Sequence, residues 1–179
     1  MFAEKGFLNA KISDIAAVAG RSAGSFYNYY DNKQQLLEAL LETFNTDVLE
    51  GTRERLTTDP RQNVEAAVRV YFEMYRKYLP EMIGVFQLSM TDEQFAAWWR
   101  QRRADGIDAV LKVVRSVEKQ GVAVDLDHGV FASAIVSMME SFCWTWYAAG
   151  GDPGIDTHDD EVAIATLSEI FRRAMYNGQ

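Results

Sequence analysis

Apolar residues recur along most of the chain at intervals of three and four positions, which is the period of an amphipathic α-helix. The clearest stripes run through residues 33–55, 62–79, 127–149 and 159–176. No alternation of apolar and polar residues persists for long enough to predict a β-strand, and no internal repeat or low-complexity tract occurs. The pattern therefore predicts an all-α fold.

Residues that commonly begin a helix stand before several of these stretches. Thr91 is followed three positions later by Gln94, which is the spacing of a capping box. Asn32 precedes the stretch that starts at residue 33, and Asp59 precedes a proline, which suits the first position of a helix. These signals separate the predicted helices from one another.

Residues 12–30 differ in kind from the long stripes, because they predict two short helices joined by a tight turn. The first is expected over residues 12–19, and Gly20 can adopt the left-handed conformation that ends a helix. Ser22 can cap a second short helix over residues 23–29. Two short helices joined by a glycine-containing turn form a helix-turn-helix unit.

The second of these short helices carries side chains that suit contact with DNA. In such units this helix enters the major groove with its N-terminal residues first. Ser22 and Ser25 offer hydroxyl groups there, and Gly24 lets the backbone approach closely. Tyr27 and Tyr29 can donate hydrogen bonds to phosphates. The alternative interpretation is a plain helical hairpin with half-buried tyrosines at its surface.

Four short stretches within the first 41 residues form a joint pattern. They are Phe2-Ala-Glu-Lys-Gly-Phe7, Ile12-x-Asp14-Ile15-Ala16, Ala19-Gly20-x-Ser22 and Gly24-Ser25-Phe26-Tyr27-x-Tyr29-Tyr30-x-Asn32-Lys33-x-x-Leu36-Leu37. Together they resemble the DNA-binding domain of the TetR (tetracycline-repressor-like) family. The resemblance implies a three-helix, helix-turn-helix domain over residues 1–45 and a helical-bundle domain for effector binding and dimerisation over residues 46–179.

The resemblance also implies roles for individual residues. Ser22, Gly24 and Ser25 take recognition-helix positions, and Tyr27 and Lys33 take phosphate-contacting positions. Tyr29, Lys11 and Arg21 complete the set. The predicted DNA-contact residues are thus Lys11, Arg21, Ser22, Gly24, Ser25, Tyr27, Tyr29 and Lys33.

The sequence departs from the family's pattern at three places. Arg21 replaces the usual small apolar residue of the turn and can contact phosphate or base. Lys11 stands where Thr or Ser usually caps, so it gives up the cap and adds a charge. The family's first helix normally begins well before the position at which this chain opens, so a truncated first helix is expected.

The net charge of −8 argues at first against a nucleic-acid partner, because phosphate neutralisation favours a basic face. Residues 1–45 hold one more acid than they hold lysines and arginines. DNA binding depends on where the cations point, and a dimer can gather them on one face. The charge therefore does not exclude DNA as a partner.

The composition, 48% hydrophobic and 25% charged, is that of a soluble globular protein. No stretch approaches the roughly 18 apolar residues of a membrane span. The N-terminus carries a glutamate and lacks the long apolar segment of a signal peptide. A single cysteine, Cys143, suits a reducing compartment. We therefore predict a cytoplasmic protein that does not contact a membrane.

Methionine and aromatic residues at helical spacing are frequent in residues 46–179. Such residues most often fill a core, which is the plain interpretation. The alternative, which the TetR resemblance favours, is an apolar cavity between helices for a small hydrophobic effector. The predicted cavity-lining residues are those in the middle of helices: Phe72, Tyr75, Phe86, Met90, Met138 and Phe142.

Residues 98–103, Trp-Trp-Arg-Gln-Arg-Arg, form the only dense basic tract. Side chains four positions apart share a helix face, so Trp98 can stack on Arg102 and Trp99 on Arg103. Such pairs can hold a carboxylate or phosphate group. A charge run more often faces solvent, and that is the plain interpretation.

The last two predicted helices have apolar faces wide enough for helix packing. The TetR resemblance implies that they pair with those of a second copy in a homodimer. A dimer would hold two recognition helices about 34 Å apart, the spacing of half-sites in palindromic DNA. Alternatively, both helices bury against their own chain.

No pattern for a metal, a cofactor or catalysis stands out. Asp125-x-Asp127-His128 and Asp156-x-His158-Asp159-Asp160 hold metal-ligating residue types, but both precede predicted helix starts, where acids cap. Cys143 is expected to be a buried structural residue. No phosphate loop, nucleophile elbow or catalytic carboxylate pair is recognisable. We expect no metal, no cofactor and no enzymatic activity.

The sequence thus favours a ligand-responsive DNA-binding transcriptional regulator, a repressor released from a palindromic operator by a small hydrophobic effector. One alternative is a helical ligand-binding or protein-interaction module that has lost autonomous DNA binding. A second is a small helical enzyme acting on a hydrophobic substrate. That alternative predicts a histidine or an acid inside the cavity, and neither is evident in the sequence.

Overall fold

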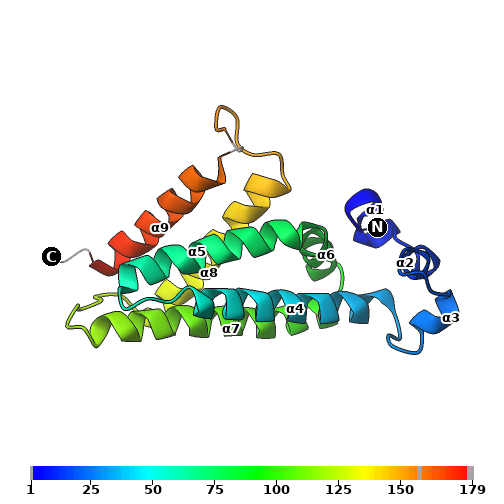
Figure 1. Ribbon diagram of the computed structural model, residues 1–179, viewed down its shortest axis with the longest axis horizontal. Coiled ribbons are helices and arrows are strands. Elements are labelled where there is room, and N and C mark those ends of the chain that lie inside the picture. The colour runs from blue at the N-terminus through cyan, green and yellow to red at the C-terminus, as the bar shows by residue number, and fades with distance from the viewer. Residues whose placement is uncertain (1, 157–158, 177–179) are drawn as a thin grey trace.

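The computed structural model describes residues 2–156 and 159–176, and every regular element within these ranges is a helix (Figure 1). In chain order the helices are α1 (Phe2–Asn9), α2 (Ile12–Val18), α3 (Ala23–Phe26), α4 (Lys33–Glu54), α5 (Pro60–Lys77), α6 (Leu79–Ser89), α7 (Glu93–Glu118), α8 (His128–Tyr147) and α9 (Asp160–Tyr176). The all-α prediction is confirmed. None of these helices is both long and apolar enough to serve as a membrane span.

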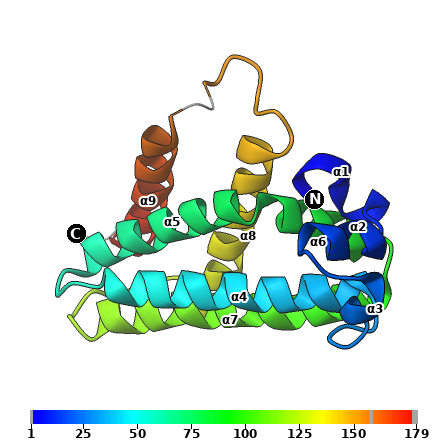
Figure 2. The ribbon, with the colours of Figure 1, turned by 45° about the vertical axis from the view of Figure 1, so that its right-hand side comes forward.

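The short helices α1, α2 and α3 form a small unit at one end of the molecule, and α4 runs from that unit along the body (Figures 1 and 2). The predicted domain limit between residues 45 and 46 falls inside α4, which continues without interruption from Lys33 to Glu54. One continuous helix therefore joins the N-terminal unit to the body.

Several predicted helix starts have the expected caps. The Asn32 side chain accepts a hydrogen bond from the Gln35 amide at 2.9 Å, and Asp59 accepts one from the Arg61 amide at 2.9 Å. The prediction for Thr91 is wrong, because Asp92 takes the cap by accepting from the Phe95 amide at 2.9 Å. A carboxylate at a helix N-terminus is favoured by the helix dipole, so α7 begins one residue later.

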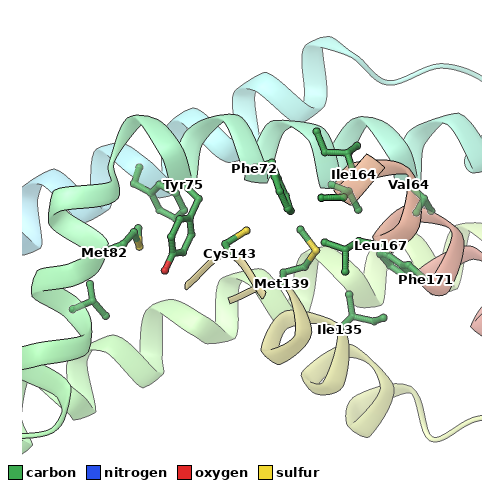
Figure 3. Close-up of a cluster of buried hydrophobic side chains, with 14 of the residues drawn as sticks. Val64, Phe72, Tyr75, Met82, Ile135, Met139, Cys143, Ile164, Leu167 and Phe171 are labelled. Atoms are coloured by element: carbon green, nitrogen blue, oxygen red, sulfur yellow. The ribbon is translucent and has the colours of Figure 1, made fainter. Parts of the chain in front are cut away.

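The core of the body lies where α5, α8 and α9 meet. Figure 3 shows α8 contributing Ile135, Met139 and Cys143 to a row of buried side chains that also draws on α5 and α9. Burying each large apolar side chain stabilises the fold by about 1.5–3 kcal/mol. The prediction that Cys143 is buried is confirmed, and burial raises the pKa of its thiol.

The acids before α8 and α9 act as helix caps. Asp127 accepts from the Val130 amide at 2.8 Å, and Asp159 accepts from the Glu161 amide at 3.0 Å. His128 Nε2 lies 3.2 Å from a carboxylate oxygen of Glu118. His158, the other histidine considered as a metal ligand, lies outside the described residues. Within the described ranges no three metal-ligating side chains gather in one place.

Candidate DNA-contact surface and apolar pocket

The turn between α2 and α3 is closed by local hydrogen bonds. Gly20 has a φ of 66°, in the left-handed region that favours glycine. The Arg21 amide donates to the Ala16 carbonyl at 2.9 Å, and the Ser25 amide donates to the Ser22 hydroxyl at 3.1 Å. The predicted helix end at Gly20 and the predicted cap at Ser22 are both confirmed. We call residues 11–29 the DNA-contact unit.

The helix α3 is shorter than predicted, since it ends at Phe26 rather than at Tyr29. Beyond Phe26 the amides of Asn28 and Tyr29 donate to carbonyls three residues back, at 3.3 and 3.0 Å, which is the bonding of a tight turn. Asparagine and aromatic residues are weaker helix formers than alanine or leucine, and they follow one another here. Tyr27 and Tyr29 therefore project from a turn that follows α3.

Most of the predicted contact side chains of this unit face solvent. The exposed ones are Lys11, Arg21, Ser22, Gly24, Tyr27 and Tyr29, the last two with 57% and 76% of their surface exposed. Ser25 is half-buried. Phe26 is buried and anchors the unit, with its ring centroid 5.6 Å from that of Tyr27 and 5.5 Å from that of Tyr30. Lys11 is the N-cap residue of α2 and makes no side-chain cap bond, as its sequence position predicts.

Among the predicted contact residues, Lys33 has its charged group bound to backbone carbonyls of another helix and the residue after it. Its ammonium group donates to the carbonyl oxygens of Phe7, Leu8 and Ala10 at 2.9, 2.6 and 3.3 Å. The last carbonyl groups of a helix have no partner within that helix, and a lysine ammonium group placed beside them can donate hydrogen bonds to them. The three bonds use all three ammonium protons, and burial lowers the pKa of Lys33. Lys33 thus ties α4 to the end of α1, and a phosphate contact would have to replace one of these bonds.

The N-terminal unit also packs directly on α6 through a close approach at Gly84. A Cβ atom at this position would lie 3.1 Å from the Cβ atom of Phe7 and 3.2 Å from a methyl group of Leu37. Phe7 is 1% exposed, so α6 supplies much of the cover for the last turn of α1. A side chain at this position would therefore force the side chains of Phe7 and Leu37 to shift by a few tenths of an ångström.

The opposite side of α6 forms one wall of a pocket of about 300 Å³. At about 100° per residue, residues 82, 86 and 89 lie on the face of α6 that is turned away from Gly84. The side chains that line the pocket are Tyr71, Tyr75, Met82, Val85, Phe86, Ser89, Met90, Trp99, Ser137, Glu140 and Ser141. They come from α5, α6, α7 and α8, together with the residue that follows α6. Figure 3 shows Tyr75 and Met82 at one end of the buried row, where the core gives way to the pocket.

The structure brings together three of the six residues predicted to line a cavity. Tyr75, Phe86 and Met90 line the pocket, and Met90 lies at its rim with 82% of its surface exposed. The other three, Phe72, Met138 and Phe142, do not line it and pack in or against the core. Phe72 lies 6.0 Å from Phe142, ring centroid to centroid. A mid-helix apolar position indicates that a side chain is buried, but it does not indicate which neighbouring helix that side chain faces.

Sequence reasoning missed three of the most distinctive lining residues, Tyr71, Trp99 and Glu140. No acid inside the cavity is evident from the sequence, but Glu140 is part of its wall. A signal for it existed: Glu140 is the one Asp, Glu, Lys or Arg residue in the otherwise apolar α8. A lone acid in an apolar helix needs a partner, and the partner is found on α7.

That partner is Arg103, from the basic tract. Its Nε donates to a carboxylate oxygen of Glu140 at 2.7 Å, and its terminal nitrogen donates to the Ser137 hydroxyl at 2.8 Å. Burial raises the pKa of Glu140, with Arg103 acting in the opposite direction. The predicted stacking of Trp98 on Arg102 is present, with the guanidinium carbon 5.8 Å from the ring centroid. Arg103 instead turns toward α8.

Comparison with known proteins matches both parts of the chain. Residues 1–40 match the family described as "Bacterial regulatory proteins, tetR family". The HTH-type transcriptional regulator EthR of Mycolicibacterium smegmatis is 20% identical over 96% of this chain and 79% of its own length. The HTH-type transcriptional activator FasR of the same species is 33% identical over 64% of this chain and 53% of its own length. Among solved structures, the fatty acid degradation regulator FadR of Bacillus halodurans has a TM-score of 0.76 at 17% identity, covering 97% of this chain and 88% of that one.

A helix-turn-helix unit at one end of an all-helical body defines a DNA-binding transcriptional regulator. The class follows from the DNA-contact unit, and the likeness in fold extends over the body as well. Residues 1–40 are similar to the TetR family of bacterial regulatory proteins, and the fold of the whole chain is similar to that of solved TetR-family regulators.

Proposed function

We propose that the protein is a homodimeric repressor that binds a palindromic DNA operator and releases it when a small hydrophobic effector enters the pocket. The observation that carries this proposal is the position of α6. One face of α6 packs on α1 through Gly84, and the opposite face lines the pocket. A ligand that displaces α6 would therefore move the packing surface of the N-terminal unit.

The coupling between pocket and DNA follows from thermodynamic linkage. If an occupied pocket disfavours the position of α1 that suits DNA, then DNA must disfavour the occupied pocket by the same free energy. Lys33 strengthens the connection, because it binds the end of α1 to the start of α4. The N-terminal unit is thus attached at two places to helices that enter the body.

The dimer is supported by exposed apolar side chains on the last two helices. Val162 and Ile170 of α9 are 60% and 49% exposed, and their spacing puts them on the same side of that helix. Val130 at the start of α8 is also exposed. We propose that a second copy covers these residues, and that the dimer presents two DNA-contact units to half-sites of an operator. Binding to DNA would place the protein in the cytoplasm.

Glu140 bears on the enzyme alternative, which predicts an acid in the cavity. Its carboxylate is held by Arg103, and among the residues that line the pocket it is the single carboxylate, with no histidine beside it. General acid–base catalysis needs a group that is free to exchange a proton with a bound substrate at the working pH. A carboxylate held by a guanidinium suits binding better, so we favour an effector pocket.

The test is selection of duplexes from a random DNA library by the full chain, followed by titration of the recovered duplex. We expect a motif with twofold symmetry and an affinity that falls steeply with salt. Enrichment of no motif would remove the DNA-binding part of the proposal.

A pocket-filling variant tests the coupling separately. Ser141→Trp places a bulky ring at the exposed edge of the pocket, and Ala104→Trp places the same ring on an exposed part of α7 away from it. We expect only Ser141→Trp to weaken DNA binding. Equal affinities for the two variants would contradict the coupling through α6.

A further inference from the structure

The pocket has an unusual combination of walls. Aromatic rings come from three different helices: Tyr71 and Tyr75 from α5, Phe86 from α6 and Trp99 from α7. Phe86 is itself stacked on Trp144, with ring centroids 3.9 Å apart. Among the described lining residues, Glu140 is the only one with a formal charge. A ligand in this pocket therefore meets aromatic faces and one carboxylate.

The two oxygens of Glu140 differ in what they bind. Arg103 Nε donates to Oε2, and no hydrogen bond to Oε1 occurs among the described residues. Arg103 is not among the residues that line the pocket, and its other nitrogen donates to the hydroxyl of the lining residue Ser137. Of this pair, the carboxylate is the member that lines the pocket, and its Oε1 is the oxygen that Arg103 does not bind.

A second polar group in the wall has no partner. The Ser89 hydroxyl is buried and makes no hydrogen bond within the described part of the chain. A buried polar atom without a partner is costly, and a ligand atom can satisfy it. The phenols of Tyr71 and Tyr75 remain neutral, since burial raises the pKa of both. The wall therefore offers hydroxyl groups, one carboxylate and no cation.

We propose that this pocket selects a cationic amphiphile, an apolar molecule with one ammonium group, and that Glu140 determines this selectivity by accepting a hydrogen bond from the ammonium through Oε1. The proposal rests on the proposed function in that it takes this pocket as the effector site. The aromatic faces add attraction for the same charge, because the face of an aromatic ring is electronegative. A carboxylate ligand of equal length is repelled by Glu140.

The experiment measures binding of three ligands with the same chain length to the full-length protein at neutral pH. They are decylamine, decanol and decanoate, each kept below the concentration at which it aggregates. Isothermal titration gives the affinity, and tryptophan fluorescence reports occupancy, because Trp99 lines the pocket. We expect decylamine to bind at least about tenfold more tightly than decanoate, with decanol between them.

Two variants assign the preference to Glu140. Glu140→Gln keeps the shape and removes the charge, so decylamine should lose about tenfold in affinity while decanol is unchanged. Glu73→Gln is the matched control, because Glu73 is paired with Arg55 and lies outside the pocket. It should leave all three affinities as they are. If Glu140→Gln does not fold, the affinities of the unchanged protein for the three ligands still test whether the pocket prefers a cationic ligand.

The proposal is overturned if decanoate binds as tightly as decylamine, if Glu140→Gln keeps the preference, or if none of the three ligands shows saturable binding. Titration of the selected DNA duplex separates this failure from that of the proposed function. Decylamine that binds without affecting DNA affinity would support the ligand class and remove the release mechanism. Release of DNA by decanoate would support the mechanism and remove the ligand class.

Discussion

The DNA-contact unit and the pocket are built in opposite ways. The unit is held by bonds between near neighbours, such as the Ser22 cap, and by one buried ring, Phe26, and it leaves polar side chains in solvent. The pocket is walled by side chains from four helices, and its acid is held from another helix by Arg103. The unit therefore keeps its own shape, while the body controls where the unit lies. Substitutions at the contacts that position the DNA-contact unit on the body test this difference.

The largest effect is expected from Phe7→Ala, at the packing of α1 on α6. Phe7 is fully buried and touches the face of α6 at Gly84, so its loss leaves a cavity that costs about 3 kcal/mol of unfolding free energy. DNA binding should fall as well, because α1 and the helices α2 and α3 that follow it lose their fixed position on α6. Chemical denaturation measures the unfolding free energy, and titration followed by fluorescence anisotropy measures the DNA affinity. Leu8→Ala, at a half-exposed neighbour, is the control and should cost less than about 0.5 kcal/mol. Equal losses for the two variants would contradict the packing role.

A smaller effect is expected from Lys33→Met, which keeps the aliphatic stem and removes three hydrogen bonds to the end of α1. We expect the unfolding free energy to fall by about 1–2 kcal/mol, since the bonds are only partly shielded from water. Lys112→Met, at an exposed i,i+4 pair with Asp108, should change it by less than about 0.5 kcal/mol. An unchanged stability together with a shallower salt dependence of DNA binding would instead assign Lys33 to phosphate contact.

The smallest effect, which concerns binding alone, is expected from Tyr27→Phe. The variant removes one exposed hydroxyl group, so the melting temperature should stay the same. DNA affinity should fall by about fivefold and by a similar factor on different duplexes, as for a phosphate contact. Ser25→Ala should instead change which base pairs are preferred. A uniform loss from Ser25→Ala and a sequence-dependent loss from Tyr27→Phe would exchange the two assignments.

Local chemistry explains why the sequence predicted the DNA-contact unit well. Gly20 and Ser22 act on atoms within five residues of themselves, so their roles depend little on the rest of the fold. The exception is Lys33, whose partners Phe7 and Leu8 lie about 25 positions earlier and are set by how α1 folds back on α4. The end of α3 was also misplaced, because weak helix propensity decided it.

The pocket was predicted less well, because helical spacing does not tell which neighbouring helix a side chain faces. Tyr75 and Phe72 are three residues apart on α5, yet one lines the pocket and the other packs against Phe142. Glu140 depends on a partner from another helix, and neither the pairing nor its place in the wall follows from its own surroundings in the sequence. The order of the helices around the pocket decides these positions.

The claim that the exposed side of α3 enters a DNA groove is tested most directly by Gly24→Leu. Gly24 is exposed, and a Cβ atom there meets only the Ser22 hydroxyl at 3.8 Å, so the protein itself has room for the larger side chain. The measurement is the affinity for the selected duplex alongside the melting temperature. We predict an unchanged melting temperature and a loss of sequence-specific affinity of more than about tenfold, because the backbone can no longer approach the bases. Full affinity in a folded Gly24→Leu variant would contradict the account.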